Sequence, residues 1–278
     1  MKKNIISLII TFSILLFSIL YISKSKDIVK NIDPLMNRIN ESKEKYEVKA
    51  IDAIIKDNTI IPGIKGKTID TEITYSKMKK YGTYNESLTT IKDVEPKISI
   101  KNNYDKYIIS GNPKNKKVSL IFLITEIEQI KLLTNYFNKE HISVTLLIND
   151  ELLEDNEELI SDLDNYELEL KFNEINDINI SQYSNYLYSV TNKNNKYCIT
   201  EKENDELLNI CKRHKLYTII PNIILSSNPT VTIKKNISNG SIILFNINSD
   251  ITKELDYIIY YIKSKGYSIT RLDKLLEE

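Results

Sequence analysis

The sequence is short of the side chains from which most metal and nucleophilic sites are built. Its 278 residues include no tryptophan, two histidines, His141 and His214, and two cysteines, Cys198 and Cys211. Structural zinc sites are typically built from closely spaced cysteine and histidine, and the sequence has no such cluster. With six glycines in all, it also has no phosphate loop, dinucleotide fingerprint or nucleophile elbow. The common zinc, nucleotide and serine-hydrolase sites are therefore excluded.

An excess of charge of either sign is also missing. The chain has 38 Lys and Arg against 38 Asp and Glu, so nothing supports nucleic-acid binding, which needs a basic surface. The apolar share of 41% is enough for a core, and the length suits an anchor plus one large domain or two small ones. Spacing alone leaves open whether Cys198 and Cys211 are paired or are two separate buried thiols.

The one long hydrophobic run lies at the start of the chain. Residues 4–23 are uncharged, with lysines immediately before and after them. At about 1.5 Å per residue, such a run just spans the ~30 Å apolar core of a bilayer. No clear small-residue cleavage site follows it. The run predicts a signal-anchor transmembrane helix over residues 1–23. The protein would then be a single-pass cell-membrane protein, most simply with its bulk outside the cytoplasm.

Two short segments follow the anchor. Asp33-Pro34 is typical of a helix start, and with the charged run beyond it we interpret residues 24–47 as a stalk helix or linker. Apolar, β-branched stretches within residues 50–61 predict a hairpin, and a further helix should end at Gly82. Residues 48–110 are therefore predicted to form a small α+β module.

From residue 111 to residue 278 the pattern alternates between strand and helix. Continuous apolar runs at residues 117–122 and 241–245 are typical of parallel strands covered on both faces. Apolar residues at helical spacing over 255–262 predict an amphipathic helix. Such alternation predicts an α/β domain with a mainly parallel sheet, either open or closed into a barrel.

The last strand carries a recognisable motif. Gly240-Ser241-Ile242-Ile243-Leu244-Phe245-Asn246, followed by the amphipathic helix and Gly266, resembles the end of the polysaccharide deacetylase family (NodB-homology carbohydrate esterases). Residues 117–124 and 165–171 resemble two earlier segments of that family. The resemblance implies a distorted, incomplete (β/α) barrel over residues 111–278. It also implies metal-dependent deacetylation of polysaccharide, with a divalent ion such as Zn²⁺.

The positions that would carry this chemistry hold unsuitable side chains. In the family, the first strand ends in two aspartates, a base and a metal ligand; here the matching residues are Leu123 and Ile124. Two metal-binding histidines correspond to Lys171 and Ile175, and the catalytic histidine corresponds to Asn246. Leucine and isoleucine offer no lone pair, and a lysine ammonium opposes a nearby cation. We therefore carry over no catalytic or metal-binding residue, and we expect an apolar mouth lined by Leu123, Ile124 and Ile175.

Four glutamates near strand ends are other candidates for chemistry. Glu126, Glu128, Glu167 and Glu169 are interpreted as solvated carboxylates or helix-start charges, although Glu167 and Glu169 share one strand face and could form a pair. His141 and His214 are interpreted as structural or exposed, His214 in the last turn of a helix.

Three hypotheses for function follow. The first is an inactive deacetylase-like protein of the cell envelope that binds cell-wall glycan or an unknown protein partner, with Lys171 pairing with an anionic sugar substituent or phosphate. The second is an active peptidoglycan or carbohydrate N-deacetylase with atypical site residues. The third is a structural envelope-assembly protein that interacts through residues 48–110.

Overall fold

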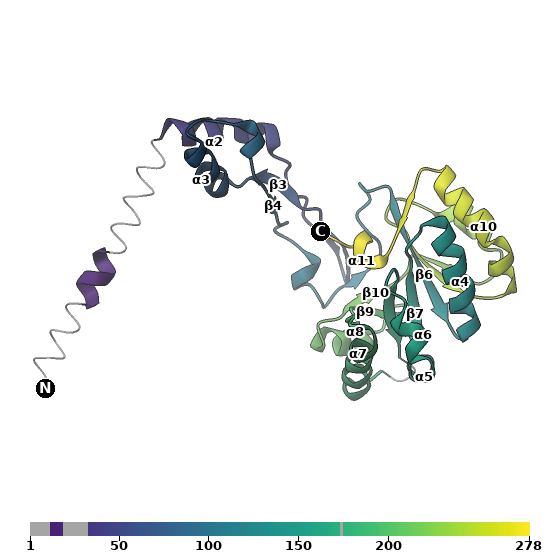
Figure 1. Ribbon diagram of the computed structural model, residues 1–278. Coiled ribbons are helices and arrows are strands. Elements are labelled where there is room, and N and C mark those ends of the chain that lie inside the picture. The colour runs from purple at the N-terminus through teal and green to yellow at the C-terminus, as the bar shows by residue number, and fades with distance from the viewer. Residues whose placement is uncertain (1–11, 19–32, 173–174) are drawn as a thin grey trace, which may run out of the picture. The chain divides into compact units, whose positions relative to one another are not determined.

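The computed structural model describes residues 12–18, 33–172 and 175–278 (Figure 1). The chain divides into two compact units, Met1–Ala50 with Lys65–Val94 and Ile51–Ile64 with Glu95–Glu278. Most of the predicted anchor lies outside the described residues. Within the described ranges, no helix is both long enough and apolar enough to cross a bilayer.

The small unit is built from two helices and a hairpin. Its elements are α2 (Pro34–Tyr46), α3 (Thr71–Tyr81), the short helix η1 (Glu86–Leu88), and the antiparallel strands β3 (Gly66–Ile69) and β4 (Ile91–Val94). The Asp33 side chain caps α2, and Gly82 ends α3 with a φ of 87°, which glycine adopts readily. Ile39, Ile69 and Met78 form its core. The helix predicted as a stalk is thus a packed part of this unit, because its apolar face is buried.

The boundaries predicted for the small module are not those of the two units. The predicted hairpin is confirmed as β1 (Ile54–Lys56) and β2 (Thr59–Ile61). However, β2 pairs with β5 (Tyr107–Ile108), and β5 pairs with β10 (Tyr217–Ile219). Residues 51–64 and 95–110 therefore belong to the large unit, through pairings between segments far apart in the chain that local periodicity does not reveal.

The large unit contains a six-stranded parallel sheet. Its order is β11-β12-β6-β7-β8, with β13 paired to the first part of β6. The strands are β6 (Lys117–Ile124), β7 (Thr145–Asn149), β8 (Glu167–Lys171), β11 (Ile223–Leu225), β12 (Ile242–Asn246) and β13 (Ser268–Thr270). The mixed α/β fold predicted from the alternating pattern is confirmed.

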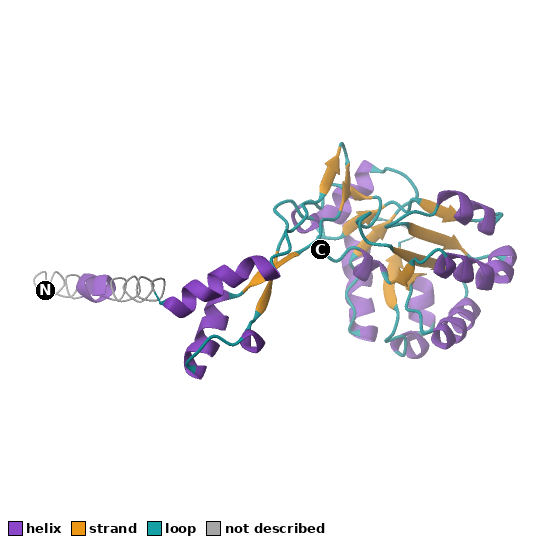
Figure 2. Cartoon of the chain, turned by 90° about the horizontal axis from the view of Figure 1, so that it is seen from above, coloured by secondary structure: helices purple, strands orange, loops and turns teal. Residues whose placement is uncertain are grey.

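Helices surround these strands, as Figure 1 and Figure 2 show. They are α4 (Ile127–Glu140), α5 (Asp150–Asp155), α6 (Glu157–Ser161), α7 (Asp177–Thr191), α8 (Asp205–Arg213), α9 (Pro229–Asn236), α10 (Ser249–Ser264) and α11 (Leu272–Leu275), with the short helix η2 (Ile100–Asn102). The apolar stripe predicted within residues 255–262 faces the core, since Leu255, Ile258, Ile259 and Ile262 are all buried.

A second sheet has the order β1-β2-β5-β10-β9, with β9 at Tyr197–Ile199. In the described part of the chain, no backbone ladder joins β8 to β9 or β10 to β11. Closure into a barrel is therefore not observed.

Successive residues of each strand supply two different cores. Val118, Leu120 and Phe122 of β6 pack in the core shared with the helices, whereas Ile121 packs in a second core with residues of both sheets. This alternation follows from the two-residue period of a strand. The second core also contains Leu272, Leu275 and Leu276, so the last helix covers one end of the space that the sheets share.

Side chains join the two sheets where the ladder is interrupted. Glu169 Oε2 accepts hydrogen bonds from the backbone N–H groups of Lys196 (2.8 Å) and Tyr197 (3.0 Å). In return, Asn195 Oδ1 accepts one from the N–H of Leu170 (2.8 Å). We call this set of contacts the β8–β9 seam. It satisfies backbone donors that would otherwise be buried without partners.

The segment that follows α11 binds the loop after β2 and the start of η2. The Glu278 carboxylate accepts hydrogen bonds from the backbone N–H groups of Gly63 and Ile100 and from the Ser99 hydroxyl. The Glu278 residue is only 6% exposed, so these bonds form away from water and are individually stronger than surface contacts. They explain why residues 51–64 and 95–110 join the large unit.

Cys198 and Cys211 form a disulfide that links β9 to α8. Of the two arrangements left open by the sequence, the paired one is present. The bond closes a short loop, which restricts the unfolded chain more than the folded one.

Replacing both cysteines by serine should lower the free energy of unfolding by about 2–4 kcal/mol, because the unfolded chain regains the freedom that the bond removes. Denaturant unfolding of the oxidised protein and the Cys198→Ser/Cys211→Ser variant measures the difference. The unsubstituted protein in reductant serves as the control and should approach the variant. Equal midpoints for all three samples would contradict the linkage.

Candidate functional site

The carboxyl ends of the parallel strands are where the family resemblance places the chemistry. Here β6 ends in Leu123 and Ile124, and β12 ends in Asn246. The register pairs Asn246 directly with Leu123, so two of the sequence-predicted positions are brought side by side. Leu123 is half-buried against the core between the sheets.

Ile124 and Ile175 do not line this mouth, contrary to the expectation from sequence. Ile124 is buried among the helix-side residues, and Ile175 packs against the same cluster. The reason is strand alternation: neighbouring residues of β6 face opposite sides, so Leu123 and Ile124 cannot share one surface.

The described residues at this edge do not fit a divalent metal ion. Lys171, the last residue of β8, is half-buried and carries a positive charge that opposes a cation. Asn246 contributes one amide, whose buried Oδ1 has no hydrogen-bond partner. Within residues 12–18, 33–172 and 175–278, no group of three His, Cys, Asp or Glu side chains could hold a metal.

His141 and His214 each cap the C-terminal end of a helix, α4 and α8, which agrees with their interpretation as structural or exposed residues. His141 follows α4 in the left-handed region, with a φ of 52°. His214 follows α8, and its Nε2 lies 2.9 Å from Asp177 Oδ1. Hydrogen bonds from Arg213 and then from His214 lower the pKa of Asp177 to about 2. Glu126 and Glu128 are exposed at the start of α4, so they are solvated as expected.

The interpretation as solvated carboxylates does not hold for Glu167 and Glu169, because both side chains are buried. Glu167 is 6% exposed and Glu169 is fully buried, on the same face of β8. Glu167 is the first residue of β8 and Glu169 is its middle residue, and the register places Glu169 in the same row of the sheet as Leu147, Leu123 and Asn246. The solvated interpretation is therefore wrong for this pair, and the only sequence signal was their two-residue spacing.

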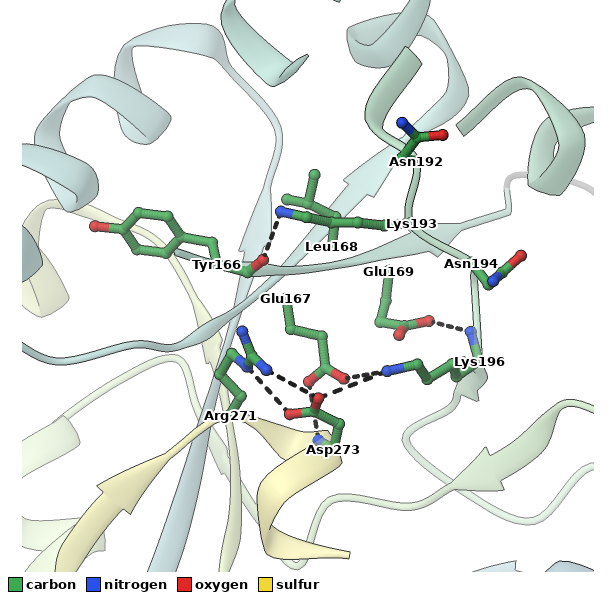
Figure 3. Close-up of a pocket in the computed structure, with 10 residues that line it drawn as sticks. All are labelled: Tyr166, Glu167, Leu168, Glu169, Asn192, Lys193, Asn194, Lys196, Arg271 and Asp273. Carbon is green, nitrogen blue, oxygen red and sulfur yellow. Dashed lines mark hydrogen bonds and ion pairs between the residues drawn. The ribbon is translucent and has the colours of Figure 1, made fainter. Parts of the chain in front are cut away.

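These glutamates border a cavity of about 290 Å³ (Figure 3). The segment before β9 contributes Lys196, and the first turn of α11 contributes Asp273. Glu167 Oε2 accepts hydrogen bonds from the Thr145 hydroxyl (2.7 Å) and the backbone N–H of Asp273 (3.1 Å). The Thr145 hydroxyl oxygen in turn accepts one from the N–H of Leu272 (2.9 Å). These two side chains satisfy free N–H groups in the first turn of α11, for which Arg271 provides no side-chain cap.

Burial raises the pKa of both glutamates, because a desolvated carboxylate is costly to ionise. The pKa of Glu169 rises well above its usual value, first through burial and then through the charge of Glu167. For Glu167 the second cause is the charge of Asp273. The seam and the cap of α11 thus hold two interacting carboxyl groups out of water.

No family model matches the sequence. The uncharacterized protein YlxY of Bacillus subtilis is 23% identical over 269 residues, which cover 88% of this chain and 84% of that protein. Among solved structures, wild-type BA3943 of Bacillus anthracis, a CE4 family pseudoenzyme, is similar with a TM-score of 0.66 and 20% identity. It covers 88% of this chain and 96% of its own. The chain has a divergent polysaccharide deacetylase fold.

Solved structures of other family 4 carbohydrate esterases match a smaller share of the chain. PdaA of Bacillus subtilis, a family 4 carbohydrate esterase, has a TM-score of 0.53 and 20% identity, and it covers 63% of this chain and 86% of its own. The coverage by BA3943 and YlxY exceeds the size of the large unit alone. Their similarity therefore extends into residues outside that unit.

Stability should fall as pH rises above about 4.5, the usual pKa of a glutamate, toward the raised folded pKa of Glu169. In that window the unfolded chain loses the proton that the folded chain retains, so ionisation favours unfolding. Glu169→Gln keeps an acceptor for the seam and should flatten this slope. Denaturant unfolding at several pH values measures it, with Glu126→Gln, an exposed glutamate, as the control. Identical slopes for the two variants would contradict the raised pKa.

Proposed function

We propose that this protein is a catalytically inactive, deacetylase-like module of the cell envelope that binds cell-wall glycan or a protein partner. One observation carries the proposal: the strand ends of a deacetylase fold place Leu123 beside Asn246, with Lys171 on β8, where the reaction needs carboxylates, histidines and a metal. Deacetylation needs a metal to polarise the carbonyl, and it needs a base and an acid within hydrogen-bond reach. These three side chains provide none of them.

Envelope location is part of the same proposal. The uncharged run over residues 4–23 supports a membrane anchor with the bulk of the chain outside the cytoplasm. The disulfide between Cys198 and Cys211 supports an oxidising compartment, where such bonds persist. The described similarity to a pseudoenzyme supports the loss of activity.

The alternative function is an active N-deacetylase with an unfamiliar site. A BA3943 mutant is titled a pseudoenzyme with restored enzymatic activity, so a protein with a similar fold can gain activity by substitution. A structural envelope-assembly role is the third candidate. It would show as envelope location without glycan affinity.

The full chain in detergent, supplied with Zn²⁺, Co²⁺ or Mn²⁺, should bind no stoichiometric metal. It should also release no acetate from peptidoglycan or N-acetylglucosamine oligomers, because the strand ends lack ligands and a base. Acetate release and bound metal are measured on one sample. Bc1960, a peptidoglycan N-acetylglucosamine deacetylase, provides the positive control. Bound metal together with acetate release would establish the active alternative.

Lys171, the last residue of β8, supplies a positive charge for an anionic glycan substituent in this proposal. Lys171→Ala should weaken binding of phosphate-bearing or carboxylate-bearing cell-wall glycan about threefold to tenfold, as expected for one charge-assisted contact. Pull-down and titration with purified wall polymer measure the change. Lys131→Ala, which removes an exposed lysine of α4, serves as the control. Equal affinity of the two variants would remove Lys171 from the proposal.

A further inference from the structure

The cavity beside Glu167 and Glu169 is lined by the first part of β8 and by residues that precede β9, and its lining includes none of Leu123, Lys171 and Asn246. Both carboxylates project from one face of β8 toward the space bordered by Lys196 and Asp273 (Figure 3). A volume of about 290 Å³ is at the small end of ligand pockets and suits a compact molecule. The cavity is thus separate from the site considered for glycan binding.

Each of the two carboxylates has one oxygen that accepts hydrogen bonds and one buried oxygen without a hydrogen-bond partner. The Oε2 atoms are used by the seam and by the cap of α11. The Oε1 atoms of Glu167 and Glu169 are buried and have no hydrogen-bond partner. A buried acceptor without a donor is costly, and native structures leave few of them. Two such atoms beside one cavity indicate that donors are supplied from outside the chain.

The cations bordering the cavity do not provide those donors. Lys193 Nζ donates to the backbone carbonyls of Leu163 and Tyr166, and the Arg271 guanidinium pairs with Asp273. Lys196 Nζ lies 3.7 Å from Glu167 Oε1, which is an ion-pair distance without a hydrogen bond. Its side chain is 46% exposed, so solvent screens much of that attraction.

The geometry points to a binding site for a small primary ammonium compound, of the size of a single amino sugar, held by Glu167 Oε1 and Glu169 Oε1. An ammonium group offers three donors and one positive charge. It therefore satisfies both Oε1 atoms, and its positive charge favours the ionised form of two carboxyl groups whose pKa burial raises when no cation is bound. A divalent metal fits less well, because the described residues form no group of three metal-binding side chains. The rim adds the amides of Asn192 and Asn194, which suit the hydroxyl groups of a sugar.

The probe is glucosamine, and N-acetylglucosamine is the matched neutral compound with the same ring. Titration of the full chain at neutral pH, followed by calorimetry or by NMR shifts, should show saturable glucosamine binding. N-acetylglucosamine should bind at least tenfold more weakly, because it lacks the charge and two of the donors.

Two variants connect this binding to the cavity. Glu169→Gln should weaken glucosamine binding at least tenfold, while Glu126→Gln, with its exposed carboxylate, should leave it unchanged. Lys196→Met should strengthen binding severalfold, because it removes a cation that competes for Glu167 Oε1. Since Lys196 is half-exposed, this variant remains informative even if Glu169→Gln unfolds.

Three results would overturn the site. They are no saturable glucosamine binding, equal affinity for the two sugars, or binding that is unaffected by Lys196→Met. Absence of binding would mean that the two carboxyl groups satisfy each other by sharing a proton. These outcomes are independent of the acetate and wall-polymer measurements, because the cavity lining includes none of Leu123, Lys171 and Asn246.

Discussion

The Glu169 carboxylate stands in for a backbone ladder at the point where the two sheets of the large unit meet. By accepting from Lys196 and Tyr197, it fixes where β9 begins, and Asn195 returns the contact to β8. The interior packing of Tyr197 and Ile199 against the strands of the other sheet depends on this placement. Burying a carboxylate has an unfavourable free energy, and the raised pKa of Glu169 reflects it.

Local sequence pattern was sufficient where a segment contains its own signal. The apolar run of β6, the stripe of α10 and the Asp33-Pro34 start of α2 each agree with the structure. By contrast, α7 lies in a stretch rich in asparagine, serine and tyrosine, and its apolar face is thin. The division into units was also beyond local pattern, because it rests on β2 pairing with β5. No single short stretch of sequence determines the register between strands that are far apart in the chain.

The candidate site also shows what a sequence motif can and cannot predict. The family motif marked Leu123 and Asn246 as residues at the ends of two strands, and the register between these strands places them side by side. It misplaced Ile124, since a motif read as a string does not say which face each residue takes. It undervalued Glu167 and Glu169, because charge and spacing alone cannot tell a buried carboxylate from a solvated one.

The β8–β9 seam is held by side chains, so it opens more easily than a continuous ladder of backbone hydrogen bonds. Separating β8 from β9 breaks three hydrogen bonds of the seam and leaves the ladders within both sheets intact. In amide hydrogen exchange, the N–H groups of Leu170, Lys196 and Tyr197 would then exchange together, through a partial opening that costs less than global unfolding. The disulfide links β9 to α8 and does not cross the β8–β9 seam. When the seam opens, β9 and α8 would therefore move as one body while the six-stranded sheet stays folded.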